Sequence, residues 1–321
     1  MNIVLDSENR VEELNMKDKY AEAMIELAEK DKNVLAFDAD LLAAIGMFAF
    51  REKFPERTID VGIQEANMCG VAAGMAKLGF IPYIHTFGAF ASRRMYDQIF
   101  MSGSYSKSNL KIIGSDPGIA AEYNGGTHAA MEDMALMRAL PGMTLIDITD
   151  TVMLKDIMAQ IKDIYGMFYL RVIRKSVNKV YKEGSTFDIG KAVTISEGKD
   201  VTIIAAGYCV SEAIKAAKML EEKNISARVL DMFTIKPIDK EAIIKAAKET
   251  GAIVTAENHN ILNGLGSAVA DVLVENAPVP MEKIGVQDIF GEVGPMSYLS
   301  ERFELNAKYI AAKCEKAIAR K

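Results

Sequence analysis

Short apolar runs alternate with segments of helical periodicity along the whole chain. The runs are rich in Val and Ile, which is typical of buried strands. The segments between them place apolar residues on one face of a helix and polar residues on the other. Strands separated by crossover helices pair in parallel, and the helices cover both faces of the sheet. The pattern therefore predicts an α/β fold built on a doubly wound, mostly parallel sheet.

The predicted elements fall into two groups. In the first, strands are expected at residues 34–37, 58–61, 81–86, 110–114, 144–148 and 168–173, and helices at 18–29, 64–78, 91–101, 131–140 and 151–161. In the second, strands are expected at residues 201–205, 227–231, 253–256 and 284–286, and helices at 210–223, 240–250, 265–275 and 307–319. Residues 174–190, between the groups, are polar and aperiodic and are interpreted as a linker. We therefore expect two domains, residues 1–180 and a smaller α/β domain at residues 181–321.

The predicted helix after residue 62 has an unusual composition. Between Gln64 and Leu78 only Glu65 and Lys77 are charged, and seven of the other residues are Ala, Gly or Cys. Small side chains let neighbouring backbone approach closely, so we expect a buried helix. A carboxylate at the start of a buried helix is costly unless a donor reaches it or it stays protonated. The residues allow an alternative, in which Glu65 only complements the positive end of the helix dipole.

The composition and charge of the chain argue against nucleic acid and membrane as partners. The chain has 38 Lys and Arg against 44 Asp and Glu, for a formal net charge of -6, and no basic stripe, so nucleic acid is not expected as a partner. The longest apolar run, residues 41–50, is too short to cross a bilayer. Residues 1–20 carry acidic side chains where a secretion signal requires basic ones. We therefore expect a cytoplasmic protein without membrane contact.

Spaced motifs then give the chain a family resemblance. A strand followed by G-I-x-E-x-N-M stands at Val61–Met68, and T-F-x-x-F stands at Thr86–Phe90. This arrangement resembles the pyrimidine-binding domain of transketolase and related thiamine diphosphate enzymes. Further motifs of transketolase and its carboxyl-terminal domain have counterparts, in order, at residues 126–128, 132–133, 256–259 and 264–266. Several motifs in the right order are far more specific than one short pattern.

The resemblance implies thiamine diphosphate as the cofactor. Glu65 is expected to bond the pyrimidine nitrogen remote from the thiazolium, which favours the imino tautomer that takes the thiazolium proton. Phe87 and Phe90 are expected to stack on the pyrimidine ring, with Ile63 also in the cofactor site. Without the motif, the alternative interpretation of the two Phe residues is that they are core aromatics. The family often has a third aromatic residue where this chain has Arg93, and Arg93 and Arg94 are interpreted as part of a solvated face.

The histidines have two interpretations each. His128 stands at the family's G-x-T-H position, where the resemblance implies contact with the hydroxyl and carbonyl oxygens of the sugar. Before the motif is considered, a lone histidine in a loop is more often a surface or capping residue. His85 ends a strand, and the strand ends of open parallel sheets commonly form the site, so it is expected near the substrate. A satisfied core histidine is the alternative, and His259 is expected to be structural or at a subunit interface.

The sugar-binding positions depart from the usual transketolase pattern. Where the family has Arg, Ser, His, Asp and a late Arg, this chain has, in order, Lys17, Ala44, Asp116, Asn124 and Arg174, so only the late Arg is kept. An Asp in place of a phosphate-binding His repels a dianion, and Lys lacks the bidentate fork of Arg. The substrate site is therefore interpreted as adapted to an unusual ketose. The far end of this ketose carries either no phosphate or a different anionic group.

The family's G-D-G motif with a later Asn, which holds the metal and the diphosphate, does not occur in the chain. We therefore assign no metal to this chain and expect Mg and the diphosphate to be bound mainly by a separate N-terminal transketolase subunit. The resemblance also implies self-dimerisation, because family sites lie where domains of different chains meet, and hence a heterotetramer. Cys69, Cys209 and Cys314 lack metal-ligand spacing and are expected to be reduced.

The first hypothesis is the carboxyl-terminal subunit of a split transketolase, which moves a two-carbon ketol unit from a ketose to an aldose. The beta subunit of a 2-oxo acid dehydrogenase shares the size and domain order, and residues 96–99 suit it. Residues 126–128 and 132–133 suit transketolase better. A deoxyxylulose phosphate synthase is usually one long chain. A non-catalytic partner subunit with a decayed sugar site is the remaining alternative, and the intact Glu65 argues against it.

Overall fold

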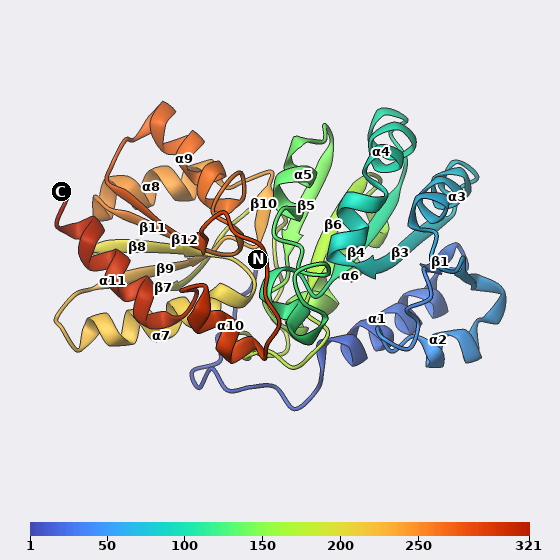
Figure 1. The fold of residues 1–321 in the computed structure, drawn as a ribbon, viewed down its shortest axis with the longest axis horizontal. Helices are drawn as coiled ribbons and strands as arrows, with labels where there is room; N and C mark the ends of the chain where they lie inside the picture. The colour runs from blue at the N-terminus through green and yellow to red at the C-terminus, as the bar shows by residue number, and fades with distance from the viewer.

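The computed structural model describes residues 1–321 and contains two α/β units that lie side by side (Figure 1). The first unit holds a seven-stranded sheet in the order β10-β5-β6-β4-β3-β1-β2. Its strands are β1 (Val34–Asp38), β2 (Thr58–Asp60), β3 (Ile81–Phe87), β4 (Leu110–Ser115), β5 (Met143–Asp147), β6 (Met167–Val172) and β10 (Thr234–Lys236). All neighbouring strands pair in parallel except β10, which runs antiparallel to β5.

The second unit holds a five-stranded sheet in the order β12-β11-β8-β9-β7. Its strands are β7 (Val193–Ser196), β8 (Val201–Ala205), β9 (Ala227–Asp231), β11 (Ile253–Asn260) and β12 (Met281–Val286). Only β7 pairs antiparallel, with β9. The predicted α/β fold with mostly parallel sheets is confirmed.

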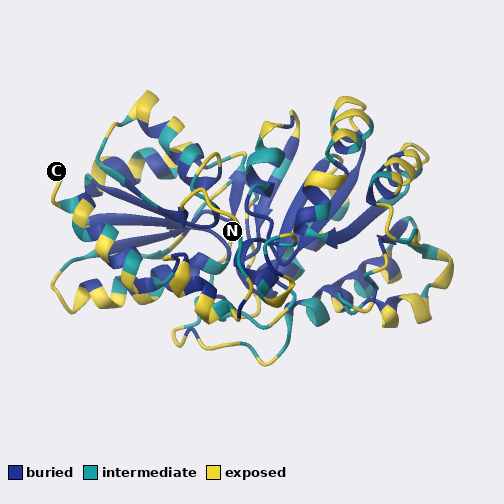
Figure 2. Ribbon diagram, viewed as in Figure 1, coloured by how far each residue is buried: buried dark blue, intermediate teal, exposed yellow.

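Helices cover both faces of each sheet, and the strands between them are buried (Figure 2). In Figure 1 the first sheet lies between two helix layers, one with α3 (Glu65–Lys77), α4 (Tyr96–Gln98) and α5 (Asp133–Ala139), the other with α1 (Met16–Lys30), α2 (Phe48–Lys53) and α6 (Thr151–Asp163). The second sheet lies between α8 (Lys240–Thr250) with α9 (Leu265–Asn276) and α7 (Tyr208–Glu221) with α10 (Met296–Arg302) and α11 (Ala307–Ile318). None of the helices is both long and apolar enough to cross a membrane.

Several elements differ from the prediction. The short elements α2, β7, β10 and α10 were not predicted. The helix predicted at residues 91–101 is not a regular α-helix. It consists of the π-helical segments η2 (Phe90–Arg94) and η3 (Ile99–Tyr105) on either side of α4. Such π-helical turns are frequent at functional sites.

The segment predicted as a domain linker, residues 174–190, packs against other parts of the chain. It forms isolated bridges with the N-terminal arm of the chain, Asn2 to Thr186, Leu5 to Tyr181 and Val11 to Asn178. Tyr181 and Phe187 are buried, with their ring centroids 4.8 Å apart. The polarity of the segment concealed these contacts, because its partners lie at the other end of the sequence. The domain boundary at residue 180 stays a prediction, and β10 crosses it to join the first sheet.

One buried arginine joins the two units. Arg171, on β6, donates from Nε to Asp133 Oδ2 at 2.9 Å and from Nη1 to Asp147 Oδ2 at 2.7 Å. Its Nη2 donates to the backbone oxygen of Asn258, on β11, at 2.7 Å. Burial raises the pKa of Asp147 to about 6, while the arginine opposes that shift. The contact with Asn258 crosses between the units, and loss of either aspartate would leave part of the buried arginine charge unpaired.

A second buried carboxyl lies at the same junction. Oδ2 of Asp231 accepts hydrogen bonds from the hydroxyls of Thr149 at 2.6 Å and Tyr181 at 2.7 Å, while its buried Oδ1 has no partner. Burial raises the pKa of Asp231 from 3.8 to about 7. Asp231 is therefore protonated in the folded chain at mildly acidic pH, where the same group in the unfolded chain is ionised.

This difference predicts a pH-dependent loss of stability. Because the folded-state pKa is raised, the contribution of Asp231 is most favourable below the unfolded pKa and is lost as pH rises toward the folded pKa. Between about pH 5 and about pH 8, the free energy of unfolding of the wild type should fall by about 2 to 3 kcal/mol relative to Asp231→Asn. Urea unfolding at both pH values measures this. Asp97→Asn, which changes an exposed side chain, is the control and should show the same pH dependence as the wild type. An equal pH dependence for wild type and Asp231→Asn contradicts the assignment.

Candidate active site

Glu65 is the first residue of α3 and is only 2% exposed. The chain enters the helix through Gly62, whose φ of 71° lies in the left-handed region that favours glycine. Oε1 of Glu65 accepts a hydrogen bond from Nη1 of Arg94 at 2.7 Å. Oε2 is buried too but has no hydrogen-bond partner within the chain. A buried carboxylate oxygen without a donor is costly, so Oε2 marks a place where a donor from a ligand fits.

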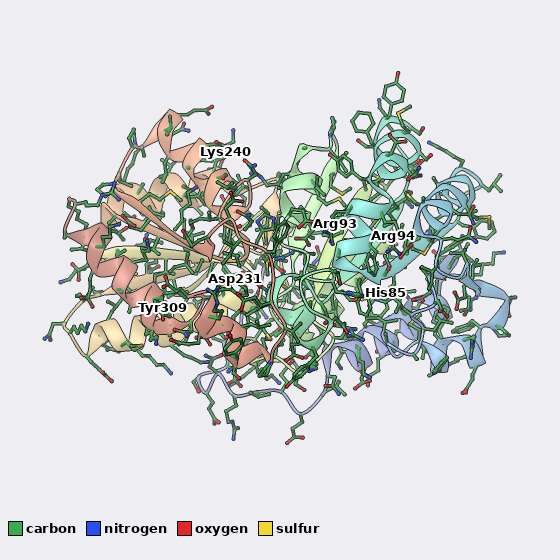
Figure 3. The ribbon with its side chains drawn as sticks, in the orientation of Figure 1. His85, Arg93, Arg94, Asp231, Lys240 and Tyr309 are labelled. Carbon is green, nitrogen blue, oxygen red and sulfur yellow. The ribbon has the colours of Figure 1, made fainter.

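Arg93 and Arg94 are exposed, as their interpretation as part of a solvated face requires, but each also pairs with a carboxylate that the sequence did not indicate. Besides its pairing with Glu65, Arg94 places its guanidinium carbon 3.9 Å from the centroid of the Phe90 ring, in a cation–π contact. Nε of Arg93 lies 2.9 Å from Oε1 of Glu132. Both arginines lie on the turn between β3 and α4 (Figure 3). The two carboxylates come from distant parts of the chain, so the residues adjoining the arginines gave no signal for either pair.

Helix α3 is buried on one face and exposed on the other, so the prediction of a buried helix holds for one face only. Its sheet-facing side includes Met68 and Ala72, both fully buried. On the opposite side Gly70, Val71 and Gly74 are exposed, and a Cβ atom added at either glycine would meet nothing within 4 Å. The small residues thus leave room for close approach from outside this chain.

Three aromatic rings meet beside Glu65 and Arg94. Phe87 is the last residue of β3, Phe90 is the first of η2, and His128 comes from the loop before α5. The His128 ring centroid lies 5.6 Å from that of Phe87 and 5.0 Å from that of Phe90, and both contacts are edge to face. The structure therefore brings together the three aromatic residues that the motifs placed in the site.

His128 keeps one ring nitrogen free. Its Nδ1 lies 2.9 Å from the hydroxyl oxygen of Thr127, while Nε2 has no hydrogen-bond partner in the chain. Burial lowers the pKa of His128, and the positive charges of Arg94 and Arg93 lower it further. The ring is therefore neutral near pH 7, so Nε2 offers a neutral hydrogen-bonding group to a ligand.

His85 is placed differently from its predicted role. It is 2% exposed, and its Nδ1 lies 2.7 Å from Asp38 Oδ2 while its Nε2 lies 3.0 Å from the hydroxyl oxygen of Ser115. A direct contact with substrate would require one of these hydrogen bonds to break. The geometry thus favours the alternative of a satisfied core histidine, which orients Asp38 and Ser115. Asp38 gave no motif signal in the sequence.

Four of the five sugar positions are joined by hydrogen bonds. Arg174 donates from its backbone nitrogen to Asp116 Oδ1 at 2.9 Å and from Nε to Asp116 Oδ2 at 2.5 Å. Its Nη1 donates to the backbone oxygen of Ala44 at 3.3 Å, and its backbone oxygen accepts from the nitrogen of Lys17 at 3.0 Å. The Arg174 guanidinium carbon also lies 4.8 Å from the centroid of the Phe87 ring. These positions therefore adjoin the aromatic rings.

The Arg174 and Asp116 pair changes the charge of this end of the site. Asp116 is buried, and both of its carboxyl oxygens accept hydrogen bonds from Arg174. Burial raises the pKa of Asp116, and the charge and hydrogen bonds of Arg174 act in the opposite direction. The one arginine kept from the family pattern is thus already neutralised within the chain. The ammonium of Lys17, by contrast, forms no ion pair within the chain.

Two predicted site residues remain outside these contacts. Ile63, expected in the cofactor site, is 70% exposed. Asn124, expected at the sugar, is exposed at the end of η4 (Gly118–Asn124), and its side chain makes no hydrogen bond within the chain. The roles of both residues stay predictions.

Asn258 of the second unit holds the backbone of residues 117–119, which directly follow Asp116. Oδ1 of Asn258 accepts from the backbone nitrogen of Ile119 at 2.9 Å, and its Nδ2 donates to the backbone oxygen of Pro117 at 2.9 Å. At Gly118 an added Cβ would lie 2.1 Å from Asn258 Oδ1, so only glycine fits there. His259 is fully buried, with Nδ1 2.7 Å from the backbone oxygen of Asn260, and burial lowers its pKa to about 4. Its contacts are those of a structural residue.

A hollow lies elsewhere on the chain. It has a volume of about 800 Å³ and lies between the N-terminal arm, β7 and α7, where Leu5, Ile195 and Ile214 line it. None of its lining residues belongs to the candidate site, so this hollow is separate from the site.

Comparison with known proteins assigns each of the two units to a domain family. Residues 12–179 match the family described as transketolase, pyrimidine binding domain, and residues 190–310 match transketolase, C-terminal domain. The 6-deoxy-6-sulfo-D-fructose transketolase subunit SqwH of Clostridium sp. (strain MSTE9) is 47% identical over 314 residues, which cover 98% of each chain. An apulose-4-phosphate transketolase subunit of Phocaeicola vulgatus is 38% identical over 270 residues, which cover 84% of this chain and 86% of that one.

A solved structure gives the same result in three dimensions. It is an inactive β4 tetramer of a split-gene transketolase, and it matches with a TM-score of 0.90 at 40% identity, covering 96% of this chain and 99% of that chain. These matches confirm the resemblance drawn from the motifs and favour a transketolase subunit over the beta subunit of a 2-oxo acid dehydrogenase. The chain therefore belongs to the transketolase family and is a subunit of a split transketolase.

Proposed function

We propose that this chain supplies the pyrimidine half of a thiamine diphosphate site in a split transketolase, with Glu65 as the residue that activates the cofactor. The observation that supports this proposal is the buried Oε2 of Glu65, which has no hydrogen-bond donor within the chain. Arg94, which pairs with Glu65, also packs on the aromatic ring of Phe90. A protonated ring nitrogen is a donor of the kind that this oxygen lacks, and flat rings are suited to pack on Phe87 and Phe90. The residues present therefore fit the cofactor.

When bound, thiamine diphosphate supplies the nucleophilic carbon that cleaves the ketose beside its carbonyl and carries the two-carbon unit to the aldose. Glu65 holds a proton at the ring nitrogen through Oε2, while Oε1 stays on Arg94. Phe87 and Phe90 orient the ring and exclude water from that proton. The neutral His128 offers Nε2 to a sugar oxygen, and Thr127 fixes the ring through Nδ1.

We further propose that an N-terminal transketolase subunit holds the diphosphate and Mg, and that this chain also pairs with a second copy of itself in a heterotetramer. The exposed face of α3 supports an interface with another chain next to Glu65. Gly70, Val71 and Gly74 are exposed on the same helix as Glu65, and Ile63 is exposed just before the helix. Self-association also has a precedent in the related split-gene transketolase, whose solved structure is a β4 tetramer.

The donor is proposed to be an atypical ketose with one negative charge at its far end, such as 6-deoxy-6-sulfo-D-fructose, which the SqwH relative is named for. Asp116 Oδ2 pairs with both Nε and Nη2 of Arg174, and Nη1 donates to the backbone oxygen of Ala44. Lys17, Arg174 and Asp116 together carry one net positive charge. A sulfonate matches that charge, whereas a phosphate dianion leaves one negative charge unbalanced.

The role of Glu65 is tested by Glu65→Gln, which keeps the size of the side chain but removes the carboxylate. With the N-terminal subunit, thiamine diphosphate and Mg, kcat should fall by at least about 100-fold, because proton transfer of this kind contributes that much. Glu13→Gln, at an exposed carboxylate, is the matched control and should retain full turnover. Turnover that survives Glu65→Gln rejects the assignment.

The substrate proposal is tested with a panel of ketose donors. The kcat/KM for the sulfonated ketose should exceed that for xylulose 5-phosphate by at least about tenfold, equivalent to about 1.4 kcal/mol. Asp116→Asn, which frees the charge of Arg174, should shift the ratio toward phosphorylated donors. A large preference of the wild type for xylulose 5-phosphate over every other donor refutes the proposal.

A further inference from the structure

Arg94 is the only group within the chain that donates a hydrogen bond to the Glu65 side chain. Its Nη1 lies 2.7 Å from Oε1, and it makes no other ion pair. The pairing is asymmetric in its exposure, since 44% of the Arg94 side chain is exposed against 2% of the Glu65 side chain. The arginine therefore covers the carboxyl from the solvent side and reaches into the site from its rim.

A second contact fixes where the guanidinium can lie. Its central carbon is 3.9 Å from the centroid of the Phe90 ring, within the range of a cation–π interaction. Phe90 and Arg94 are the first and last residues of η2, so this one π-helical turn positions both the ring and the cation. The Glu65 carboxyl is consequently held by a group that is itself anchored on the aromatic cluster.

The two contacts together give the carboxyl a defined orientation. Rotation of the carboxyl group would break the hydrogen bond between Oε1 and Arg94, so Oε2 is left as the one acceptor that lacks a donor. A carboxyl group held in this way, with a single free oxygen, is an acceptor prepared for a protonated nitrogen.

We propose that Arg94 is a positioning residue for Glu65: it holds the carboxylate so that Oε2 alone is presented to the aminopyrimidine of thiamine diphosphate. This inference rests on the proposed role of Glu65. Arg94 acts through Glu65 and does not itself contact the reacting atoms. Loss of Arg94 leaves a buried carboxylate without any donor in the chain, and its orientation is then no longer set before the cofactor binds.

The test is a double-mutant cycle on cofactor binding. The Kd for thiamine diphosphate is measured by calorimetry with the N-terminal subunit and Mg present, for wild type, Glu65→Gln, Arg94→Gln and the double variant. We expect Arg94→Gln to weaken binding by about tenfold or more in the Glu65 background and to have little further effect in the Gln background. Near-ultraviolet circular dichroism of the bound aminopyrimidine, which reports its tautomer, should change in Arg94→Gln, and Arg94→Lys should restore part of the affinity because it keeps the charge.

Arg51→Gln is the matched control, because Arg51 also lies over an aromatic ring, 4.7 Å from the centroid of Phe48, on an exposed surface. It should leave Kd, kcat and KM unchanged. If Arg94→Gln weakens binding equally in both backgrounds, Arg94 acts independently of Glu65 and the inference is overturned. If Glu65→Gln impairs binding and turnover but Arg94→Gln does not, only the inference fails. If Glu65→Gln itself has no effect, the proposed function fails as well.

Discussion

A buried carboxylate with one oxygen paired and the other bare is the constraint on which the site depends. Taking an ionised carboxyl out of water is expensive, and an oxygen without a donor adds to that cost. The chain offsets part of the cost with Arg94 and with the position of Glu65 in the first turn of α3, where the helix dipole favours negative charge. The part that remains is what a ligand with a hydrogen-bond donor removes on binding.

The fold provides this arrangement at the carboxyl-terminal ends of its parallel strands. The turn after β3 supplies Phe90 and Arg94, and Phe87 ends the strand itself. From Glu65 the contacts continue through Arg94, the aromatic rings and Arg174 to Asp116. Glu65 and the predicted sugar-binding residues Arg174 and Asp116 are therefore connected by a continuous series of direct contacts.

The regular elements were predictable because their signal is local. The strands at Val201–Ala205 and Ala227–Asp231 and the helix at Lys240–Thr250 have the bounds that the apolar pattern predicts. By contrast, β10 lies far along the sequence from the other strands of the first unit's sheet, where it pairs with β5, and the segment predicted as a linker pairs with the N-terminal arm. Pairings between distant segments leave no periodic signal in either partner.

The distinction between local signals and contacts of distant segments also explains which site residues could be predicted. Spaced motifs pointed to Glu65, Phe87, Phe90 and His128, and the structure brings these residues together. Arg94 was missed because its partner is 29 residues away along the chain and no motif contains it. For His85 the sequence allowed two interpretations, and only the hydrogen bonds to Asp38 and Ser115 distinguish them.

The central claim concerns one oxygen atom, and a crystal structure of the complex with the N-terminal subunit, thiamine diphosphate and Mg measures it most directly. The account predicts that Oε2 of Glu65 lies within about 3.2 Å of the pyrimidine nitrogen remote from the thiazolium, the limit for such a hydrogen bond, while Oε1 remains on Arg94. A Glu65 carboxyl that points into solvent, or an Oε2 that is bonded to another protein group with the cofactor in place, contradicts the account.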